Sequence, residues 1–329
     1  MIAQLDGGYV KASGPRTLVR LASYLAFEGR PAAARGQFVN PLVLAHLRAA
    51  ARRPAKRIVD RPVFVIGMGR SGTTVLGLVL GTHRDVGFLN EPKALWHVIR
   101  GDEDIIGTYS GTPGRLRLSG VDADADLGRR AHSLYSWYLG VTRSKRVVDK
   151  YPELIFRTGF VHGLFPDAQM VVVTRQPWPT IASVGRWTGS PSDTDADWWG
   201  VNDRKWQILW KEGVEGEPTN SDLANLALGA QTNSHVRAAV EWIVTMRAAL
   251  MLDCNHDDRL TIVNYEKLTE EPAATVGGLL EWLGLERRNA TIDYAANGLR
   301  PGRCSEPIPL EAPLRDLVDA TERRLREYA

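Results

Sequence analysis

Short apolar segments alternate with amphipathic ones through most of the chain. Five runs rich in β-branched residues have the length of strands, and the segments between them repeat apolar positions three or four residues apart, as helices do. The expected strands are residues 63–66, 86–89, 146–149, 170–174 and 260–263. Because strands and helices alternate, we predict an α/β fold with a central parallel sheet flanked by helices.

Helical patterns fill the rest of this scheme. The helices expected inside it are residues 72–81, a helix through Trp96, and residues 127–141, 153–164, 179–186 and 272–283. Two more, residues 16–27 and 41–53, precede the first strand. We therefore predict an N-terminal helical extension over residues 1–60 that packs on a core domain spanning residues 61–329.

Residues 187–231 break the alternation. Five tryptophans fall within 24 positions there, among acidic residues and glycines: Trp187, Trp198, Trp199, Trp206 and Trp210. Long irregular insertions in compact domains are usually lids or binding loops. Trp198 and Trp199 stand in an acidic loop and could stack on a flat or apolar ligand, whereas Trp206 and Trp210, at helical spacing, fit a core position equally well.

The strongest chemical signal is the glycine-rich turn after the first strand. A β-branched strand, this turn and an apolar helix together build an anion site from backbone N–H groups and the positive end of the helix. The turn almost fits the pattern G-x-x-x-x-G-K-[ST], but Thr73 replaces the lysine that reaches the β- and γ-phosphates of a triphosphate. We therefore expect a bound phosphate that is not part of a triphosphate. The residues concerned are Gly67, Arg70, Ser71, Gly72, Thr73 and Thr74.

A second cation stands at the end of another expected strand. Arg175 follows residues 171–174, and Ser183 follows on the next helix. Open α/β sheets bind ligands at this edge, so the two side chains could share an anion. Taken alone, a strand-end arginine is more often part of a structural ion pair.

The composition limits the classes of function. The chain has 329 residues, 44% of them apolar, with a net charge of +3. That charge suits an anionic ligand and is too small for a nucleic-acid surface. Cys254 and Cys304 show no metal or disulfide spacing, so we expect a reducing compartment, the cytoplasm. Residues 1–9 lack the apolar core of a signal peptide, and no apolar run is long enough to span a membrane.

A basic cluster ends the second N-terminal helix: Arg48, Arg52, Arg53, Lys56 and Arg57. A solvated helical surface is the simpler interpretation. Peripheral contact with an anionic membrane surface or a polyanion is the alternative, and it also requires a strongly amphipathic helix.

The glycine-rich loop and the pair Arg175 and Ser183 together resemble the nucleotide signatures of sulfotransferases that use 3′-phosphoadenosine 5′-phosphosulfate. The resemblance covers about residues 61–285 and weakens across the tryptophan-rich insertion. Arg70 is similar to the Golgi-type and many bacterial members, whereas cytosolic members carry lysine there. Further matches are residues 147–152, 164–168, 264–268 and 280–284, with Pro272.

This resemblance implies a nucleotide-binding set. The loop residues Arg70, Ser71, Gly72, Thr73 and Thr74 would hold the 5′-phosphosulfate. The 3′-phosphate would lie between Arg175 and Ser183, closed by Arg303 or, at the neighbouring position, Arg300, and Tyr265 would lie near the adenine or serve as core packing. No metal is expected, because fixed cations neutralise the charge.

It also implies a catalytic set of Glu91, Lys150 and Arg70. Cytosolic members place a histidine where this chain has Pro152, so the base would be Glu91, as in other branches. A carboxylate can do this if its site raises its pKa, although a carboxylate at a helix N-terminus is the structural alternative. Lys150 would stabilise the leaving oxygen, or alternatively pair with Glu153 at the surface.

The resemblance implies a P-loop-like three-layer sandwich and transfer of a sulfonyl group to an acceptor hydroxyl. The tryptophan-rich insertion by itself favours a carbohydrate, glycolipid or small secondary metabolite as the acceptor. Trp96, His97, Trp198 and Trp199 are the candidate acceptor contacts. The expected partner is a small-molecule or glycan acceptor, with no nucleic acid, and a homodimer is left open. A P-loop nucleotide or small-molecule kinase, and a binding protein without turnover, remain alternatives.

Overall fold

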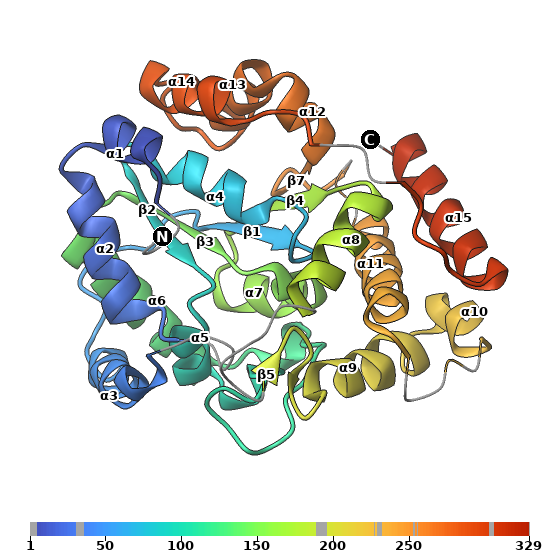
Figure 1. Ribbon diagram of the computed structural model, residues 1–329. Helices are drawn as coiled ribbons and strands as arrows, with labels where there is room; N and C mark the ends of the chain where they lie inside the picture. Colours follow the sequence, from blue (N-terminus) through green and yellow to red (C-terminus); the bar gives the residue numbers. More distant parts are fainter. Residues whose placement is uncertain are drawn as a thin grey trace.

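A sheet of five parallel strands forms the centre of the computed structural model, which describes residues 5–30, 36–188, 196–226, 228, 232–252, 254, 256–302 and 306–328 (Figure 1). The strands are β1 (Val63–Gly67), β2 (Val86–Asn90), β3 (Arg146–Lys150), β4 (Gln169–Thr174) and β7 (Leu260–Asn264). Their order is β2-β3-β1-β4-β7, and every neighbouring pair is parallel. The predicted strands and the parallel sheet are confirmed.

Successive residues of each strand face opposite helical layers, because side chains alternate along a strand. Val63 and Val65 of β1 pack in one layer, and Phe64 and Ile66 pack in the other. Both faces are therefore buried, which explains why the strands read as unbroken apolar runs. The first layer contains α1 (Gly7–Ser13), α4 (Thr73–Gly81), α12 (Tyr265–Glu270), α13 (Pro272–Trp282) and α14 (Asn289–Gly298). The second contains α3 (Asn40–Ala51), α5 (Lys93–Ile99), α6 (Ala125–Thr142) and α7 (Thr158–Leu164).

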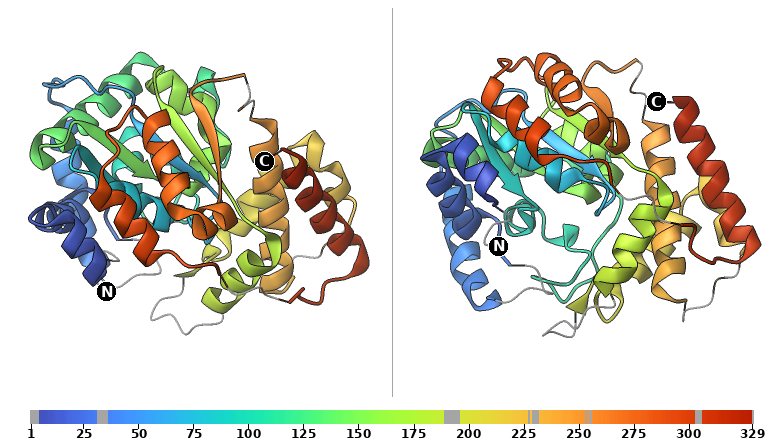
Figure 2. Two further views of the ribbon diagram at one scale, coloured as in Figure 1. Left: turned by 90° about the horizontal axis from the view of Figure 1, so that it is seen from above. Right: turned by 45° about the horizontal axis from the view of Figure 1, so that its top comes forward.

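Further helices pack outside these two layers. Helix α2 (Arg16–Phe27) packs beside the edge strand β2. A helical block next to the carboxyl ends of β1 and β4 buries its own apolar cluster, and its C-terminal helix lies far from the N-terminal helices in all three views (Figures 1 and 2). The block consists of α8 (Pro177–Thr188), α9 (Arg204–Ile208), α10 (Ser221–Ala224), α11 (Ser234–Met251) and α15 (Ala312–Tyr328). The division into an extension of residues 1–60 and a domain of residues 61–329 stays a prediction.

The tryptophan-rich insertion is more regular than predicted. A short hairpin, β5 (Ala196–Asp197) and β6 (Gly200–Val201), leads into α9, which continues as a π-helix, η6 (Leu209–Glu215). Trp206 on α9 is 5% exposed and packs against Trp199, so the helical spacing at Trp206 marked a core position. The short 3₁₀ helices are η2 (Gln37–Val39), η3 (Gly101–Glu103), η4 (Gly120–Asp122), η5 (Pro152–Arg157) and η7 (Pro218–Asn220).

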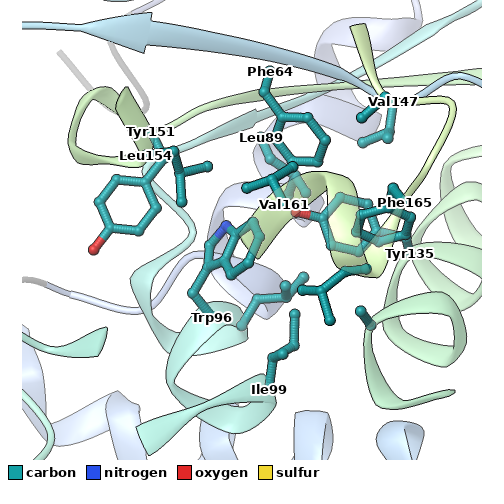
Figure 3. Packing of buried hydrophobic residues seen from close by; sticks show 14 of the residues in the cluster. Phe64, Leu89, Trp96, Ile99, Tyr135, Val147, Tyr151, Leu154, Val161 and Phe165 are labelled. Atoms are coloured by element: carbon teal, nitrogen blue, oxygen red, sulfur yellow. The ribbon is translucent and has the colours of Figure 1, made fainter. Parts of the chain in front are cut away.

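Trp96 lies in the core beneath β1 and β3, not at a ligand surface (Figure 3). Its side chain is 1% exposed, and its ring contacts the rings of Phe64 and Tyr135. Its indole N–H donates to Asp149 at 2.9 Å. The hydrogen bond satisfies the buried indole, and burial raises the pKa of Asp149 to about 7. We therefore withdraw Trp96 from the candidate acceptor contacts.

None of the helices in the described residues is both long and apolar enough to cross a membrane.

Candidate active site

All five strands deliver a candidate residue to the same edge of the sheet. The glycine-rich loop follows β1, Glu91 follows β2, and Lys150 ends β3. Arg175 follows β4, and Tyr265 follows β7. Parallel strands place their carboxyl ends together, where open α/β sheets bind ligands. The register aligns these ends, because Asn90 lies opposite Lys150 and Thr174 lies opposite Asn264.

The glycine-rich loop makes a tight turn into α4. Backbone φ is +140° at Gly67, +70° at Arg70 and +96° at Gly72. A Cβ at Gly67 would lie 2.5 Å from the carbonyl oxygen of Val173, so glycine is required there. The turn leads directly to the first N–H groups of the helix, which lack helical acceptors. Its geometry therefore fits the predicted anion cradle.

The side chains of the loop support the same interpretation. Ser71 is fully buried, and its Oγ has no hydrogen-bond partner among the described residues. Thr73 is 1% exposed, and Thr74 is half-buried. A buried hydroxyl without a partner is costly unless a ligand satisfies it.

Arg70, Arg175 and Ser183 come together beside this loop. Arg70 Nε donates to Ser183 Oγ at 3.0 Å, and Arg175 donates to the carbonyl oxygen of Arg70 at 2.7 Å. The Arg175 guanidinium lies 4.1 Å from the centre of the Tyr265 ring. The side chain of Arg70 is thus directed to Ser183, toward the group predicted for the second phosphate.

Arg175 is also short of negative charge. Its Nε is buried and has no partner in the described parts of the chain. Burial lowers the pKa of this guanidinium, and although Tyr265 and Glu266 oppose the change, Arg70 and Arg186 lower it further. A bound anion would relieve the repulsion between the guanidinium groups, as expected of a phosphate site.

Glu91 is held by two ammonium groups. Its Oε1 lies 2.5 Å from Lys150 Nζ, and its Oε2 lies 3.7 Å from Lys93 Nζ. Its backbone has a φ of +49°, which is uncommon for a residue with a side chain, and its N–H donates to the Lys150 carbonyl at 2.7 Å. Burial by itself would raise the pKa of Glu91, but Lys150 and Lys93 outweigh it and lower that pKa to about 2.

A cavity of about 130 Å³ opens between this carboxylate and the tryptophan-rich insertion. Its volume corresponds to about four water molecules at ~30 Å³ each. Loop, strand-end and insertion residues line it: Gly67, Met68, Gly69, Glu91, Lys93, Ile106, Pro152, Glu153, Phe156, Trp187, Asp197, Trp198, Lys205, Glu241 and Thr245.

Trp198 closes the cavity over the glycine-rich loop. A Cβ at Gly69 would lie 2.5 Å from its ring, so this glycine admits the indole. Trp198 Nε1 donates to Glu241 at 2.7 Å, and Lys205 Nζ lies 4.2 Å from the ring centre. Trp187 meets Trp198 edge to face with ring centres 5.7 Å apart. Trp198 is therefore the predicted acceptor contact that reaches the cavity.

Two other candidates lie elsewhere, and a third lies outside the described residues. Trp199 is 1% exposed, packed against Trp206, and is withdrawn as an acceptor contact because a buried ring offers no face. His97 does not line the cavity; its ring packs 5.3 Å from that of Tyr109, and burial lowers its pKa. Arg303 lies outside the described residues.

Sequence reasoning missed five charged lining residues: Lys93, Glu153, Asp197, Lys205 and Glu241. Lys205 and Glu241 form a buried ion pair at 2.6 Å. Lys93 and Glu153 lie just beyond the ends of β2 and β3, which is a positional signal that could have identified them. Lys205 and Glu241 come from α9 and α11, which were not predicted, so no comparable signal existed. No group of three or more metal-ligating side chains occurs among the described residues.

Comparison with known proteins finds a family match over part of the chain. Residues 62–212 match the model of the sulfotransferase family. This segment belongs to that family. The sulfotransferase segment contains the glycine-rich loop, Glu91, Lys150, Arg175 and Trp198, and its branch within the family stays a prediction.

More distant relatives are similar over much of the chain. Nodulation protein NoeE of Sinorhizobium fredii is 25% identical over 237 residues, which is 68% of this chain and 50% of NoeE. An uncharacterized protein of Aquifex aeolicus is 22% identical over 71% of this chain and 27% of its own length. The chain thus spans half or less of these curated relatives. Sulfotransferase STF1 from Mycobacterium tuberculosis is 16% identical, covers 99% of both chains and gives a TM-score of 0.49.

The tight space and positive φ at Gly72 make this residue sensitive to substitution. In Gly72→Ala the new methyl group would overlap the Tyr265 ring, and alanine would have to adopt a φ of +96°. We expect binding of adenosine 3′,5′-bisphosphate to weaken at least about tenfold, because the loop and Tyr265 must move apart. Calorimetric titration measures this.

Gly128→Ala is the matched control, since a Cβ there meets no atom within 4 Å and the residue lies inside helix α6. Equal affinities of wild type, Gly128→Ala and Gly72→Ala would contradict the anion cradle.

Proposed function

We propose that this chain transfers a sulfonyl group from 3′-phosphoadenosine 5′-phosphosulfate to a hydroxyl of an acceptor. The observation that carries the proposal is the contact of the glycine-rich loop with Arg175 and Ser183, made through Arg70, beside a cavity lined by Glu91. Family membership of the segment that contains them supports the same activity.

The donor suits these two groups because it carries a phosphosulfate at one end and a 3′-phosphate at the other. The glycine-rich loop with Ser71, Thr73 and Thr74 would hold the first, and Arg175, Ser183 and Arg70 would hold the second. The unpartnered Ser71 Oγ and Arg175 Nε are donors that such anions would satisfy. The donor has no γ-phosphate, so it requires no lysine at Thr73. Contacts of Tyr265 with adenine and of Arg303 with the 3′-phosphate stay proposals.

In the proposed mechanism Glu91 accepts the proton of the acceptor hydroxyl. The acceptor oxygen forms its bond to sulfur as the bond from sulfur to the bridging phosphate oxygen breaks. Lys150 and the loop N–H groups would stabilise the negative charge on the leaving oxygen and the sulfonyl group. Arg70, whose side chain is directed to Ser183, is assigned to the 3′-phosphate and not to this charge. These fixed cations are why we propose that no metal takes part.

The cavity supports a neutral, hydroxyl-bearing acceptor. Trp187 and Trp198 offer aromatic walls to the apolar face of a sugar or a small metabolite. Glu153, Asp197 and Glu241 line the cavity and could accept hydrogen bonds from hydroxyl groups. A carbohydrate, a glycolipid headgroup or a small secondary metabolite would fit this chemistry.

Calorimetry without metal tests the donor. We expect adenosine 3′,5′-bisphosphate to bind in the absence of Mg²⁺ and ATP to bind more weakly with or without it. A P-loop kinase would instead prefer ATP with Mg²⁺. A protein that binds the bisphosphate but releases no product from labelled donor across a panel of acceptors would be a binding protein.

Glu91→Gln tests the base. The amide keeps the size of the side chain and cannot accept the proton, so we expect turnover to fall by about 10²- to 10⁴-fold. Binding of the bisphosphate, measured by calorimetry, should remain. Glu286→Gln is the control, because its pair with Arg84 is exposed at the surface. Turnover that survives in Glu91→Gln would remove this residue from the role.

Membrane contact, a homodimer and a cytoplasmic location remain proposals. The N-terminal helices expose Leu18, Leu25, Phe38 and Leu42 near the basic cluster, which supports contact with an anionic bilayer. We expect co-sedimentation with vesicles that contain anionic lipid, lost when Leu18 and Leu42 are replaced by serine. Equal sedimentation with neutral vesicles would contradict an electrostatic contribution.

A further inference from the structure

Four buried or partly buried charges form a row at the edge of the cavity: Lys150, Glu91, Lys93 and Glu153. The successive nitrogen–oxygen distances are 2.5 Å, 3.7 Å and 3.3 Å. Lys150 and Lys93 are 1% and 8% exposed, and Glu153 is 13% exposed, whereas Glu91 is 38% exposed. Of the four, Glu91 therefore opens most widely to an acceptor.

This row opposes the role proposed for Glu91. A carboxylate between two ammonium groups is a poor base, since both favour its ionised form. If Lys150 moves to the leaving oxygen, Lys93 still remains beside Glu91. A second group must then compete for Lys93.

Glu153 is that competitor. Lys93 Nζ already lies closer to Glu153 Oε1 than to Glu91 Oε2. The second oxygen of Glu153, Oε2, is buried and has no partner among the described residues, so it can accept a further N–H from the same ammonium. A buried lysine needs a counter-charge wherever it lies, and Glu153 can supply it without help from Glu91.

The neighbouring charges leave this competition in place. Lys205 helps to lower the pKa of both Glu91 and Glu153, but its ammonium is bonded to Glu241 at 2.6 Å. Glu103 helps to raise the pKa of Lys93, but the Glu103 carboxylate already accepts hydrogen bonds from Arg157 at 3.2 Å and Tyr151 at 2.6 Å.

We propose that Lys93 is a positioning residue shared between two carboxylates, and that Glu153 draws it away from Glu91 when Lys150 engages the donor, which leaves Glu91 able to take a proton. The inference rests on the function proposed above. It assigns Lys93 and Glu153 to the control of the base, with no contact to the reacting atoms.

Proton uptake on nucleotide binding tests the inference without an acceptor. Adenosine 3′,5′-bisphosphate is titrated at about pH 5.5, above the pKa of about 2 of Glu91 in the free protein, in two buffers of different ionisation enthalpy. The difference between wild type and Glu91→Gln isolates the proton taken up by Glu91 from that of the ligand phosphates. We expect measurable uptake by Glu91 in wild type.

Two variants should shift this uptake in opposite directions. Lys93→Gln removes the remaining ammonium, so the pH at which uptake is half complete should rise by about 1 to 3 units. Glu153→Gln leaves Lys93 to Glu91, so uptake should fall toward that of Glu91→Gln. Asp222→Asn is the control, because it breaks an ion pair with Arg247 outside the cavity and should leave uptake unchanged.

The outcomes distinguish a failure of the proposed function from a failure of the shared role of Lys93. If wild type does not bind the bisphosphate, the proposed function fails. If it binds but both variants shift uptake in the same direction, or neither does, the shared role of Lys93 is wrong while the function stands. A general loss of packing would lower thermal stability in both variants without opposite shifts in uptake.

Discussion

The parallel direction of the five strands is the constraint on which the rest of the structure depends. Because all strands end at one edge, groups far apart in the sequence converge there, and the pairing of Asn90 with Lys150 sets Glu91 beside the strand-end lysine. Helices on both faces bury the sheet and hold that register. The carboxyl ends of the strands thus gather polar side chains from distant parts of the sequence around the cavity.

That convergence creates an electrostatic problem, which the structure resolves by pairing. Buried charges are tolerated when each has a partner and remaining hydrogen bonds are satisfied. Lys150 pairs with Glu91, Lys93 with Glu153, and Lys205 with Glu241. Among the buried polar atoms that have no partner in the described residues, Ser71 Oγ, Arg175 Nε and Glu153 Oε2 lie in or beside the candidate site. The ion pairs neutralise the buried charges, and the polar atoms without a partner remain available to bind a ligand.

The glycine-rich loop and the insertion act on each other. Gly69 lacks a side chain where the Trp198 indole approaches, and Gly72 lacks one where Tyr265 packs. The loop therefore serves two purposes, since its bare backbone can face an anion on one side and accept aromatic rings on another. Trp198 is in turn held by Glu241 from α11, so the wall of the cavity depends on a helix distant in sequence.

Much of the fold could be predicted because strand periodicity and glycine-rich turns are local signals. The five strands and the strand-end positions of Glu91, Lys150 and Arg175 follow from such signals. Helix α11 was missed because it is buried on nearly all sides, which removes the amphipathic stripe that sequence reading relies on. Trp96 and Trp199 were misjudged for a related reason, since a tryptophan in sequence does not show whether its ring faces a ligand or the core.

The sequence by itself determined the parallel α/β architecture, the glycine-rich turn and the family resemblance, because these depend on residues close together in the chain. Tertiary structure alone decided which ammonium lies beside which carboxylate and which tryptophan reaches the cavity. Those choices depend on distances of a few ångströms between β2, η5, α9 and α11, and spacing along the chain does not encode them.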